Sequence, residues 1–316
     1  MNVLVTGGLG HIGSKLIREY SKRKEISLIR IMDNMLTQRY ASLFNLPERK
    51  GLKYEFFEGD ITEKKDLERG LQNIDIVIHL AAITDAPSTI GNRTETERVN
   101  FLGTKKIVEG AMKKNVKKFL FPSTTSVYGE SEGLVDENSP DERYKPASPY
   151  AESKRKTELY LEKIGKEQGF NITVLRMGTI FGASPGMRFH TAINKFCYLA
   201  ALGKPLTVWD SALESKRPYL GLYDDIRAFA FLEKYGKAGE IYNVVTANYE
   251  MGEIIETIRE FVPYTEIQIT KSPLLNQKPY EVGSDKIRNL GFDFKDSLRG
   301  GIKATLDLLK GVKNKI

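Results

Sequence analysis

The chain has 316 residues, of which 41% are hydrophobic and 28% are charged, so it is long and apolar enough to fold and is not a disordered polymer. Its net charge of +7 admits a nucleic-acid partner, but Lys and Arg are interspersed with acidic residues and no aromatic-basic module is present. We therefore expect no nucleic-acid partner. The longest apolar run, residues 74–83, is interrupted by Asp75 and His79 and is too short to span a bilayer, so no membrane partner is expected either.

The cysteine and histidine content argues against a disulfide framework and a metal site. Cys197 is the single cysteine, and His11, His79 and His190 lack the partner spacing of a metal site or a catalytic triad. No secretory signal pattern precedes the first predicted strand. We expect a cytoplasmic protein without a metal.

The first half of the chain alternates short β-branched runs with helical patterns. The expected strands are residues 3–5, 27–32, 53–57, 75–79, 118–121 and 173–175. Helical patterns lie between most of them, for example at residues 12–22 and 95–113. This alternation, with nearly continuous apolar strands, is typical of a parallel sheet that is buried on both faces.

The pattern loosens after about Met177. The expected elements are a Gly/Pro-rich loop at residues 182–186, a helix at 189–202, a strand at 206–209 and an extended segment at 217–222. A further helix is expected from residue 224, and a last helix at residues 297–309. No low-complexity linker separates the two halves. We therefore predict an α/β fold: a doubly wound parallel sheet from residues 1–177 and about 219–247, with a smaller α+β lobe from residues 178–218 and 248–316.

A glycine-rich turn follows the first predicted strand. Gly7, Gly10 and Gly13 have the spacing G-x-x-G-x-x-G and lead directly into a predicted helix. Small residues let the backbone approach a pyrophosphate, which then lies at the positive end of that helix. Asp33 lies 20 residues past Gly13, at the end of the second strand, where a carboxylate can accept hydrogen bonds from the ribose hydroxyls of NAD. The same carboxylate would repel the extra phosphate of NADP, so we expect NAD as the cofactor.

Tyr150 and Lys154 are four residues apart and therefore share one side of a predicted helix. A phenol is a poor base at its ordinary pKa near 10, and a nearby ammonium favours the phenolate. Such a pair can take a proton from a hydroxyl while hydride leaves the same carbon. A cluster of hydroxyl side chains at residues 123–126 precedes the pair at the end of a predicted strand.

These motifs, in this order, resemble the extended branch of the short-chain dehydrogenase/reductase superfamily, which includes nucleotide-sugar epimerases and dehydratases. The resemblance runs from Val3 to about Leu309, nearly the whole chain. It implies a Rossmann-type sheet that binds NAD and a lobe that binds a nucleotide sugar. It also implies a homodimer, with residues 95–113 and 151–166 packing against their copies as a four-helix bundle.

The resemblance assigns roles to particular residues. Thr124 matches the hydroxyl that hydrogen-bonds the reacting oxygen, Tyr150 matches the base, and Lys154 matches the residue that holds the ribose and lowers the pKa of Tyr150. The implied cofactor contacts are Gly7, Gly10, His11, Ile12, Gly13, Asp33, Asn34, Asp60, Ile61, Leu80, Ala81, Ala82, Asn100, Tyr150 and Lys154.

The implied substrate contacts are Thr84, Thr125, Ser126, Thr179, Arg188 and Arg217. Arg217 matches the family arginine that binds the nucleotide phosphates. Family members that dehydrate the sugar carry Asp-Glu directly after the catalytic Thr, whereas this chain carries Thr125 and Ser126. Thr179 replaces the Asn that usually contacts the substrate phosphates. Arg188 lies in a loop that resembles the branch with GDP-heptose 4-dehydrogenases.

The sequence therefore predicts an enzyme that oxidises and reduces C4 of a nucleotide sugar. A 4-epimerase of the UDP-glucose/UDP-galactose type is our first expectation. A C4 dehydrogenase that releases a 4-keto sugar, or passes the hydride to an external acceptor, is the alternative. A non-catalytic NAD-binding scaffold is disfavoured because Thr124, Tyr150 and Lys154 are all present. The sugar and the nucleotide base stay open.

Overall fold

The computed structural model describes residues 1–316 except 130, 132, 214, 272–279 and 312–316. Parts of the predicted lobe, namely residues 214, 272–279 and 312–316, therefore lie outside the described residues. Among the helices that are described, none is both long and apolar enough to cross a membrane.

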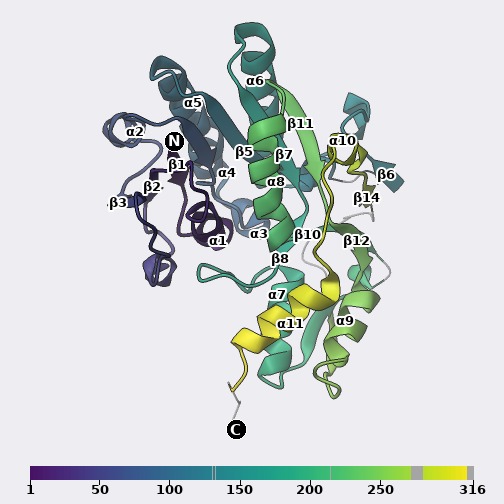
Figure 1. Ribbon diagram of the computed structural model, residues 1–316. Helices are drawn as coiled ribbons and strands as arrows, with labels where there is room; N and C mark the ends of the chain where they lie inside the picture. The colour runs from purple at the N-terminus through teal and green to yellow at the C-terminus, as the bar shows by residue number, and fades with distance from the viewer. Residues whose placement is uncertain (130, 132, 214, 272–279, 312–316) are drawn as a thin grey trace.

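The centre of the molecule is a sheet of seven strands in the order β11-β7-β5-β4-β1-β2-β3 (Figure 1). All neighbouring strands in it are parallel. The strands are β1 Asn2–Thr6, β2 Leu28–Asp33, β3 Lys53–Glu58, β4 Ile76–His79, β5 Lys118–Thr124, β7 Ile172–Met177 and β11 Glu240–Val244. The predicted doubly wound parallel sheet is confirmed, and all six strands predicted in the first half belong to it.

Helices cover both faces of this sheet. They are α1 His11–Tyr20, α2 Lys64–Gly70, α4 Arg93–Glu97, α5 Thr104–Lys113, α6 Pro149–Gln168 and α8 Leu222–Tyr235, and the short helix α3 Ala86–Thr89 packs on α6. The predicted helix at residues 95–113 is present as α4 and α5 joined by a π-helical segment, η2 Arg98–Gly103.

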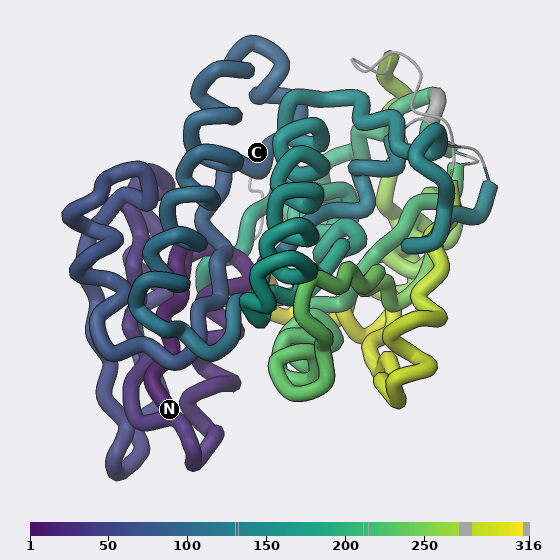
Figure 2. Tube along the Cα trace, turned by 90° about the horizontal axis from the view of Figure 1, so that it is seen from above, coloured from purple at the N-terminus to yellow at the C-terminus, as the bar shows by residue number. Residues whose placement is uncertain are grey.

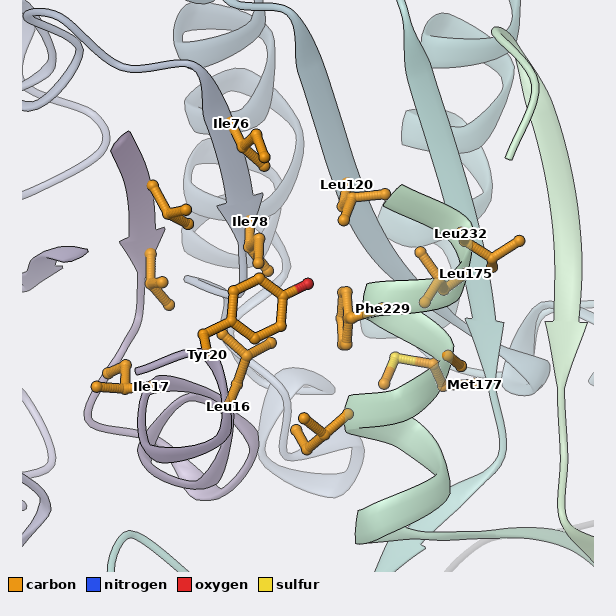
Figure 3. Packing of buried hydrophobic residues seen from close by; sticks show 14 of the residues in the cluster. Leu16, Ile17, Tyr20, Ile76, Ile78, Leu120, Leu175, Met177, Phe229 and Leu232 are labelled. Carbon is orange, nitrogen blue, oxygen red and sulfur yellow. The ribbon is translucent and has the colours of Figure 1, made fainter. Parts of the chain in front are cut away.

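Alternation along each strand divides the core between the two faces. In β1, Val3 and Val5 belong to one hydrophobic cluster, while Leu4 belongs to the other. Figure 3 shows the first cluster, in which Leu16 of α1 and Phe229 of α8 pack beside side chains of the sheet. These apolar contacts on both faces explain why the strands carry nearly continuous hydrophobic runs.

A smaller lobe lies below the carboxyl ends of the central strands in Figure 1. Its described residues form three helices, a three-stranded sheet and a two-stranded sheet with their own hydrophobic cluster. Its elements are α7 Ala192–Ala201, α9 Met251–Arg259 and α11 Leu298–Leu308, with β8 Thr179–Phe181, β10 Lys216–Gly221 and β12 Ala247–Glu250, and with β9 Leu206–Trp209 beside β13 Ile267–Thr270. The predicted strand at residues 206–209 is confirmed.

The chain crosses between the sheet and the lobe several times. β6 Gly133–Val135, from the first half, pairs with β14 Tyr280–Val282, and α10 Asp285–Asn289 places Ile287 in the cluster that packs on the central sheet. Figure 2 shows the purple β1–β3 end of the molecule and the yellow segment around α10 on opposite sides. The lobes are thus interwoven, and the domain boundaries drawn from the sequence stay a prediction.

Candidate active site

The turn between β1 and α1 is compact because its glycines leave no room for side chains. Gly7 has φ +64°, and a Cβ on it would lie 2.6 Å from the backbone N of Ala81. A Cβ on Gly13 would lie 2.5 Å from the carbonyl oxygen of Gly8. Gly10 is the N-cap of α1 and provides no side-chain cap, so the first N–H groups of the helix face the turn. This cradle fits a pyrophosphate.

A cavity lies at the carboxyl ends of β1, β2, β3 and β4, and we call it the cofactor cavity. Twelve of the predicted cofactor residues line it: Gly7, Gly10, His11, Ile12, Gly13, Asp33, Asn34, Asp60, Ile61, Leu80, Ala81 and Ala82. They come from the loops after four neighbouring parallel strands, which meet at one edge of the sheet.

Asp33 is held at this edge by backbone donors. Its Oδ2 accepts from Leu9 N at 3.0 Å, and its Oδ1 accepts from Met35 N at 3.0 Å. Each carboxylate oxygen still has a lone pair for a further donor, which suits a ribose diol. The carboxylate is thus fixed in orientation while it lines the cavity.

Two cations in this cavity were missed at the sequence level. Arg39 and Arg98 both line it, and Arg39 Nη1 would lie 3.9 Å from a Cβ on Gly10. Burial and the charge of Arg188 lower the pKa of Arg39 to about 10, against the opposing effect of Asp33. Arg39 lies in an irregular segment without periodicity, so no pattern pointed to it.

Asn100 supports the cavity wall from behind and is not among the described lining residues. Its Oδ1 accepts from Ile83 N at 2.8 Å, and its Nδ2 donates to Ile83 O at 2.9 Å and to Ser153 Oγ at 3.1 Å. It lies within the π-helical segment η2, a distortion often found at functional sites. Asn100 therefore ties the end of the β4 loop to α6, which carries Tyr150.

Thr124 and Tyr150 come together at the end of β5. Helix α6 starts at Pro149 with Ser148 as its N-cap, whose hydroxyl accepts from Ala151 N at 3.2 Å, and this places Tyr150 in the first turn. Thr124 is near enough to the phenol to act on its pKa, and its hydroxyl donates to Ser126 Oγ at 3.1 Å. Burial raises the pKa of Tyr150, while the Thr124 hydroxyl and the charge of Arg188 oppose that rise.

Lys154 is buried one turn along α6. Its Nζ donates to Pro122 O at 2.7 Å and lies 4.4 Å from the centroid of the Phe121 ring. Burial lowers the pKa of Lys154 to about 7, against the opposing charge of Glu158. Lys154 is therefore anchored on β5.

A second cavity, which we call the lobe cavity, opens between the start of α6 and the lobe. Its lining includes Ser126, Ser148, Ala151, Thr179, His190, Lys195, Trp209, Arg217, Tyr219 and Tyr280. Three predicted substrate contacts therefore line this cavity, namely Ser126, Thr179 and Arg217. No Asp or Glu is found among the described residues that line this cavity.

Three predicted substrate residues lie elsewhere. Thr84 and Arg188 line the cofactor cavity, and Arg188 donates a hydrogen bond to Thr84 Oγ1. Thr125 is buried, and its carbonyl oxygen accepts from the Tyr280 hydroxyl at 3.2 Å. Thr125 thus supports Tyr280, which lines the lobe cavity in its place.

Comparison with known protein families identifies the family of this chain. The sequence model of the NAD dependent epimerase/dehydratase family matches residues 3–245. The chain belongs to this family. It is therefore an NAD-dependent enzyme, as predicted, and the cofactor cavity has the residues that NAD needs: an open helix N-terminus, a glycine cradle and the Asp33 carboxylate.

Curated members of the family differ in activity. The chain is 32% identical over 320 residues to the dTDP-D-glucose 4,6-dehydratase of Homo sapiens, a match that covers 96% of this chain and 89% of that protein. It is 31% identical over 253 residues to an uncharacterized UDP-glucose epimerase of Bacillus subtilis, covering 77% of this chain and 76% of the relative.

The solved structures agree with the fold. A UDP-glucose 4-epimerase of Thermus thermophilus in complex with NAD is similar with a TM-score of 0.80 and 26% identity, over 98% of this chain and 99% of that chain. A dTDP-glucose 4,6-dehydratase of Streptomyces venezuelae gives the same TM-score at 24% identity, over 97% of this chain and 96% of that chain, which bears on the fold alone.

Proposed function

We propose that this family member is a nucleotide-sugar 4-epimerase of the UDP-glucose/UDP-galactose type. The observation that carries the proposal is that Thr124 and Tyr150 come together beside a lobe cavity whose described lining has no carboxylate. The pair supports proton transfer at a sugar hydroxyl, and the missing carboxylate argues against a dehydration step.

The chemistry follows from the position of the pair. Tyr150, as the phenolate, takes the proton of the C4 hydroxyl, and Thr124 holds the same oxygen by a hydrogen bond. Bound NAD, held by the glycine-rich turn and Asp33, would supply the hydride acceptor and donor for C4. Tyr150 then gives its proton back to the oxygen. No net oxidation results, and Lys154 supports the ribose side from its anchor on β5.

Cationic and aromatic groups in the lobe cavity suit the nucleotide part of the substrate. Lys195 and Arg217 line the cavity and can neutralise a diphosphate. Trp209 lines it as well and is partly exposed, so it offers a face on which a base can stack. Burial lowers the pKa of Arg217, whose guanidinium carbon lies 5.2 Å from the centroid of the Tyr280 ring.

A 4,6-dehydratase needs an additional acid to assist the departure of the C6 hydroxyl. In this chain the two positions after Thr124 are Thr125, which is buried, and Ser126, which lines the lobe cavity with a hydroxyl. Neither side chain can act as a carboxylic acid. The dehydratase names among the relatives, at 32% identity, therefore do not decide the activity of this chain.

The experiment is to incubate the protein with UDP-, GDP-, CDP- and dTDP-sugars and follow the sugar by NMR and the reduced nicotinamide by absorbance. We expect interconversion of two C4 epimers without net NADH, and Tyr150→Phe as the matched inactive control. A lasting rise in NADH would contradict the epimerase assignment and indicate a C4 dehydrogenase. Formation of a 4-keto-6-deoxy sugar would contradict the epimerase assignment and indicate a 4,6-dehydratase.

We also propose a homodimer through the exposed faces of η2–α5 and α6. Leu102 is 44% exposed and Leu159 is 51% exposed on these helices, so apolar side chains are available for such a contact. Light scattering at micromolar concentration should give the dimer mass, and Leu159→Glu should give the monomer mass. A wild-type monomer would contradict this assembly.

A further inference from the structure

The loop at residues 182–188 of the lobe lies directly on the glycine-rich turn. Ser184 Oγ donates a hydrogen bond to His11 O at 2.8 Å. A Cβ on Gly186 would lie 2.5 Å from Gly10 O, so the backbones of the loop and the turn are in close contact. The loop is therefore fixed against the cofactor side of the molecule.

Asn194 of α7 fixes both ends of this loop. Its Oδ1 accepts from Gly182 N at 3.1 Å, and its Nδ2 donates to Arg188 O at 3.3 Å. Asn194 is fully buried, so these bonds are protected from water. The backbone of Arg188 is consequently held in one place, and its side chain starts from a rigid position.

A second segment reaches the same turn from the end of β2. Arg39 is the residue before the short helix η1 Tyr40–Leu43, and its Nη1 would lie 3.9 Å from a Cβ on Gly10. Ser42 of η1 donates a hydrogen bond from its hydroxyl to Leu9 O at 2.7 Å. Arg39 is therefore placed beside the turn by a segment that is itself bonded to it.

The two arginines lie on opposite flanks of the glycine-rich turn. Arg39 follows β2, whereas the Arg188 guanidinium donates to Thr84 Oγ1, which follows β4. Strands β2 and β4 are the two neighbours of β1 in the sheet, and the turn follows β1. Both side chains line the cofactor cavity, one from the sheet and one from the lobe.

The carboxylates of this cavity are already engaged elsewhere. Among the described lining residues they are Asp33, Asp60 and Glu95. Glu95 forms an ion pair with Arg98 at 2.7 Å, and Asp60 accepts from Thr62 N at 2.7 Å. Asp33 accepts from two backbone N–H groups, as described above. Arg98 is thus neutralised within the cavity wall.

Arg39 and Arg188 differ from Arg98 in this respect. Within the part of the chain that the structure describes, neither of them forms an ion pair, and both are partly buried. Burial lowers the pKa of Arg39 to about 10, and the like charge of Arg188 acts in the same direction. Two partly buried cations that repel each other across an open cavity are a favourable setting for an anion.

We propose that Arg39 and Arg188 bind the diphosphate of NAD from the two sides of the glycine-rich turn. Guanidinium groups suit phosphate oxygens because they donate two parallel hydrogen bonds, and the open N–H groups of α1 complete the site. Arg188 comes with the lobe loop, so the lobe helps to hold the cofactor. The inference rests on the NAD dependence of the family and not on the epimerase reaction.

The test is calorimetric titration of the nucleotide-free full chain with NAD and with ADP-ribose, which has the same diphosphate but no nicotinamide. Arg39→Gln and Arg188→Gln should each lower the affinity for both nucleotides by about tenfold or more, because charged hydrogen bonds to phosphate are lost. Arg299→Gln is the matched control, since Arg299 is exposed on α11 and lines neither cavity. It should leave both affinities unchanged.

Salt dependence separates a charge contact from structural damage. The affinity of the wild type for NAD should fall as salt is added, because salt screens the attraction between the arginines and the diphosphate. Each Gln variant should show a shallower dependence on salt. Arg39→Lys and Arg188→Lys should restore the salt dependence and part of the affinity, since an ammonium keeps the charge but not the planar pair of donors.

The contribution of the loop is tested by Ser184→Ala, which removes its bond to His11 O. This variant should weaken NAD binding less than Arg188→Gln does. In the Arg188→Gln background it should cause little additional loss, because the residue that the loop positions is already changed. An equal loss in both backgrounds would contradict a role of the loop through Arg188.

Unchanged NAD affinity in either Gln variant would overturn the inference, and so would a loss of affinity with the salt dependence of the wild type. The titration requires no turnover, so it is independent of the proposed function. A protein that binds NAD through both arginines but converts no nucleotide sugar would support the inference and contradict the epimerase. Epimerase turnover with unchanged NAD affinity in the Gln variants would do the reverse.

Discussion

The two cavities open at the same edge of the central sheet but are built in different ways. All but one of the residues lining the cofactor cavity come from residues 7–99, at or after the carboxyl ends of four neighbouring strands, and its key features are glycines and backbone N–H groups. The residues that line the lobe cavity come from segments spread between Ala86 and Tyr280, and its chemical character is set by their side chains. Cofactor recognition is thus local in the sequence, whereas substrate recognition depends on how distant segments come together.

The largest effect on turnover should come from a change at Tyr150, at the junction between the cavities. Tyr150→Phe removes one hydroxyl and should lower turnover by about a hundredfold or more, the usual scale for a lost general base. NAD affinity and thermal stability should change little, because the ring stays in place. Thr124→Val should cost less, since Thr124 orients the oxygen and does not hold the proton. Full activity of Tyr150→Phe in a steady-state assay would contradict the assignment of Tyr150 as the catalytic base. Tyr223→Phe, at an exposed position, is the control and should keep its activity.

The glycine cradle gives the next effect. Gly13→Ala introduces a Cβ within 2.5 Å of Gly8 O, so the turn must shift, and NAD affinity measured by calorimetry should fall more than tenfold. Gly252→Ala in α9 is the matched control, because a Cβ there meets nothing within 4 Å. That control should stabilise the protein by up to about 1 kcal/mol. Equal NAD affinity in both variants would mean that the pyrophosphate does not lie on this turn.

Asp33 tests whether the cofactor cavity distinguishes NAD from NADP. Asp33→Asn removes the charge and leaves one oxygen acceptor for the two bonds from Leu9 N and Met35 N. NAD affinity should fall about tenfold, and the preference for NAD over NADP should shrink, because the repulsion of the extra phosphate is lost. Asp293→Asn, at an exposed position, should change neither affinity. Tight NADP binding by the wild type would contradict the placement of Asp33.

The smallest effect concerns acid stability. Burial lowers the pKa of His79 to about 3, and its ring nitrogens bond to Thr6 Oγ1 at 2.7 Å and Thr104 Oγ1 at 2.9 Å. Because this pKa is depressed on folding, the unfolded chain takes up the proton first as the pH falls below about 6.5. The free energy of unfolding should therefore fall by about 1 kcal/mol per pH unit from this group. Urea unfolding of His79→Asn should show a shallower loss of stability between about pH 6 and about pH 4, and a slope identical to that of the wild type would contradict it.

The sequence predicted the parts that depend on local patterns. The strands of the central sheet follow from their apolar runs, and the glycine turn and Asp33 follow from a spacing that the parallel topology places at one edge. Helix α7 begins at Ala192, three residues later than predicted, because residues 182–188 and the following turn are used to reach the glycine-rich turn.

The parts that were missed depend on tertiary contacts. Arg39 lies in an irregular segment, and its approach to Gly10 is visible only in the folded chain. Arg188 was predicted as a substrate contact, but the bonds of Ser184 and Gly186 to the start of α1 place its side chain in the cofactor cavity. Neither residue belongs to a periodic pattern, so the sequence holds no physical signal for the direction of its side chain.

The central claim is that C4 is oxidised and reduced in one site without loss of water. The most direct measurement uses UDP-glucose that carries deuterium at C4, with the products followed by NMR. The account predicts UDP-galactose with deuterium still at C4 and no accumulation of NADH. Deuterium that appears at C6 of a 4-keto-6-deoxy sugar, or a 4-keto sugar formed together with reduced cofactor, would contradict it.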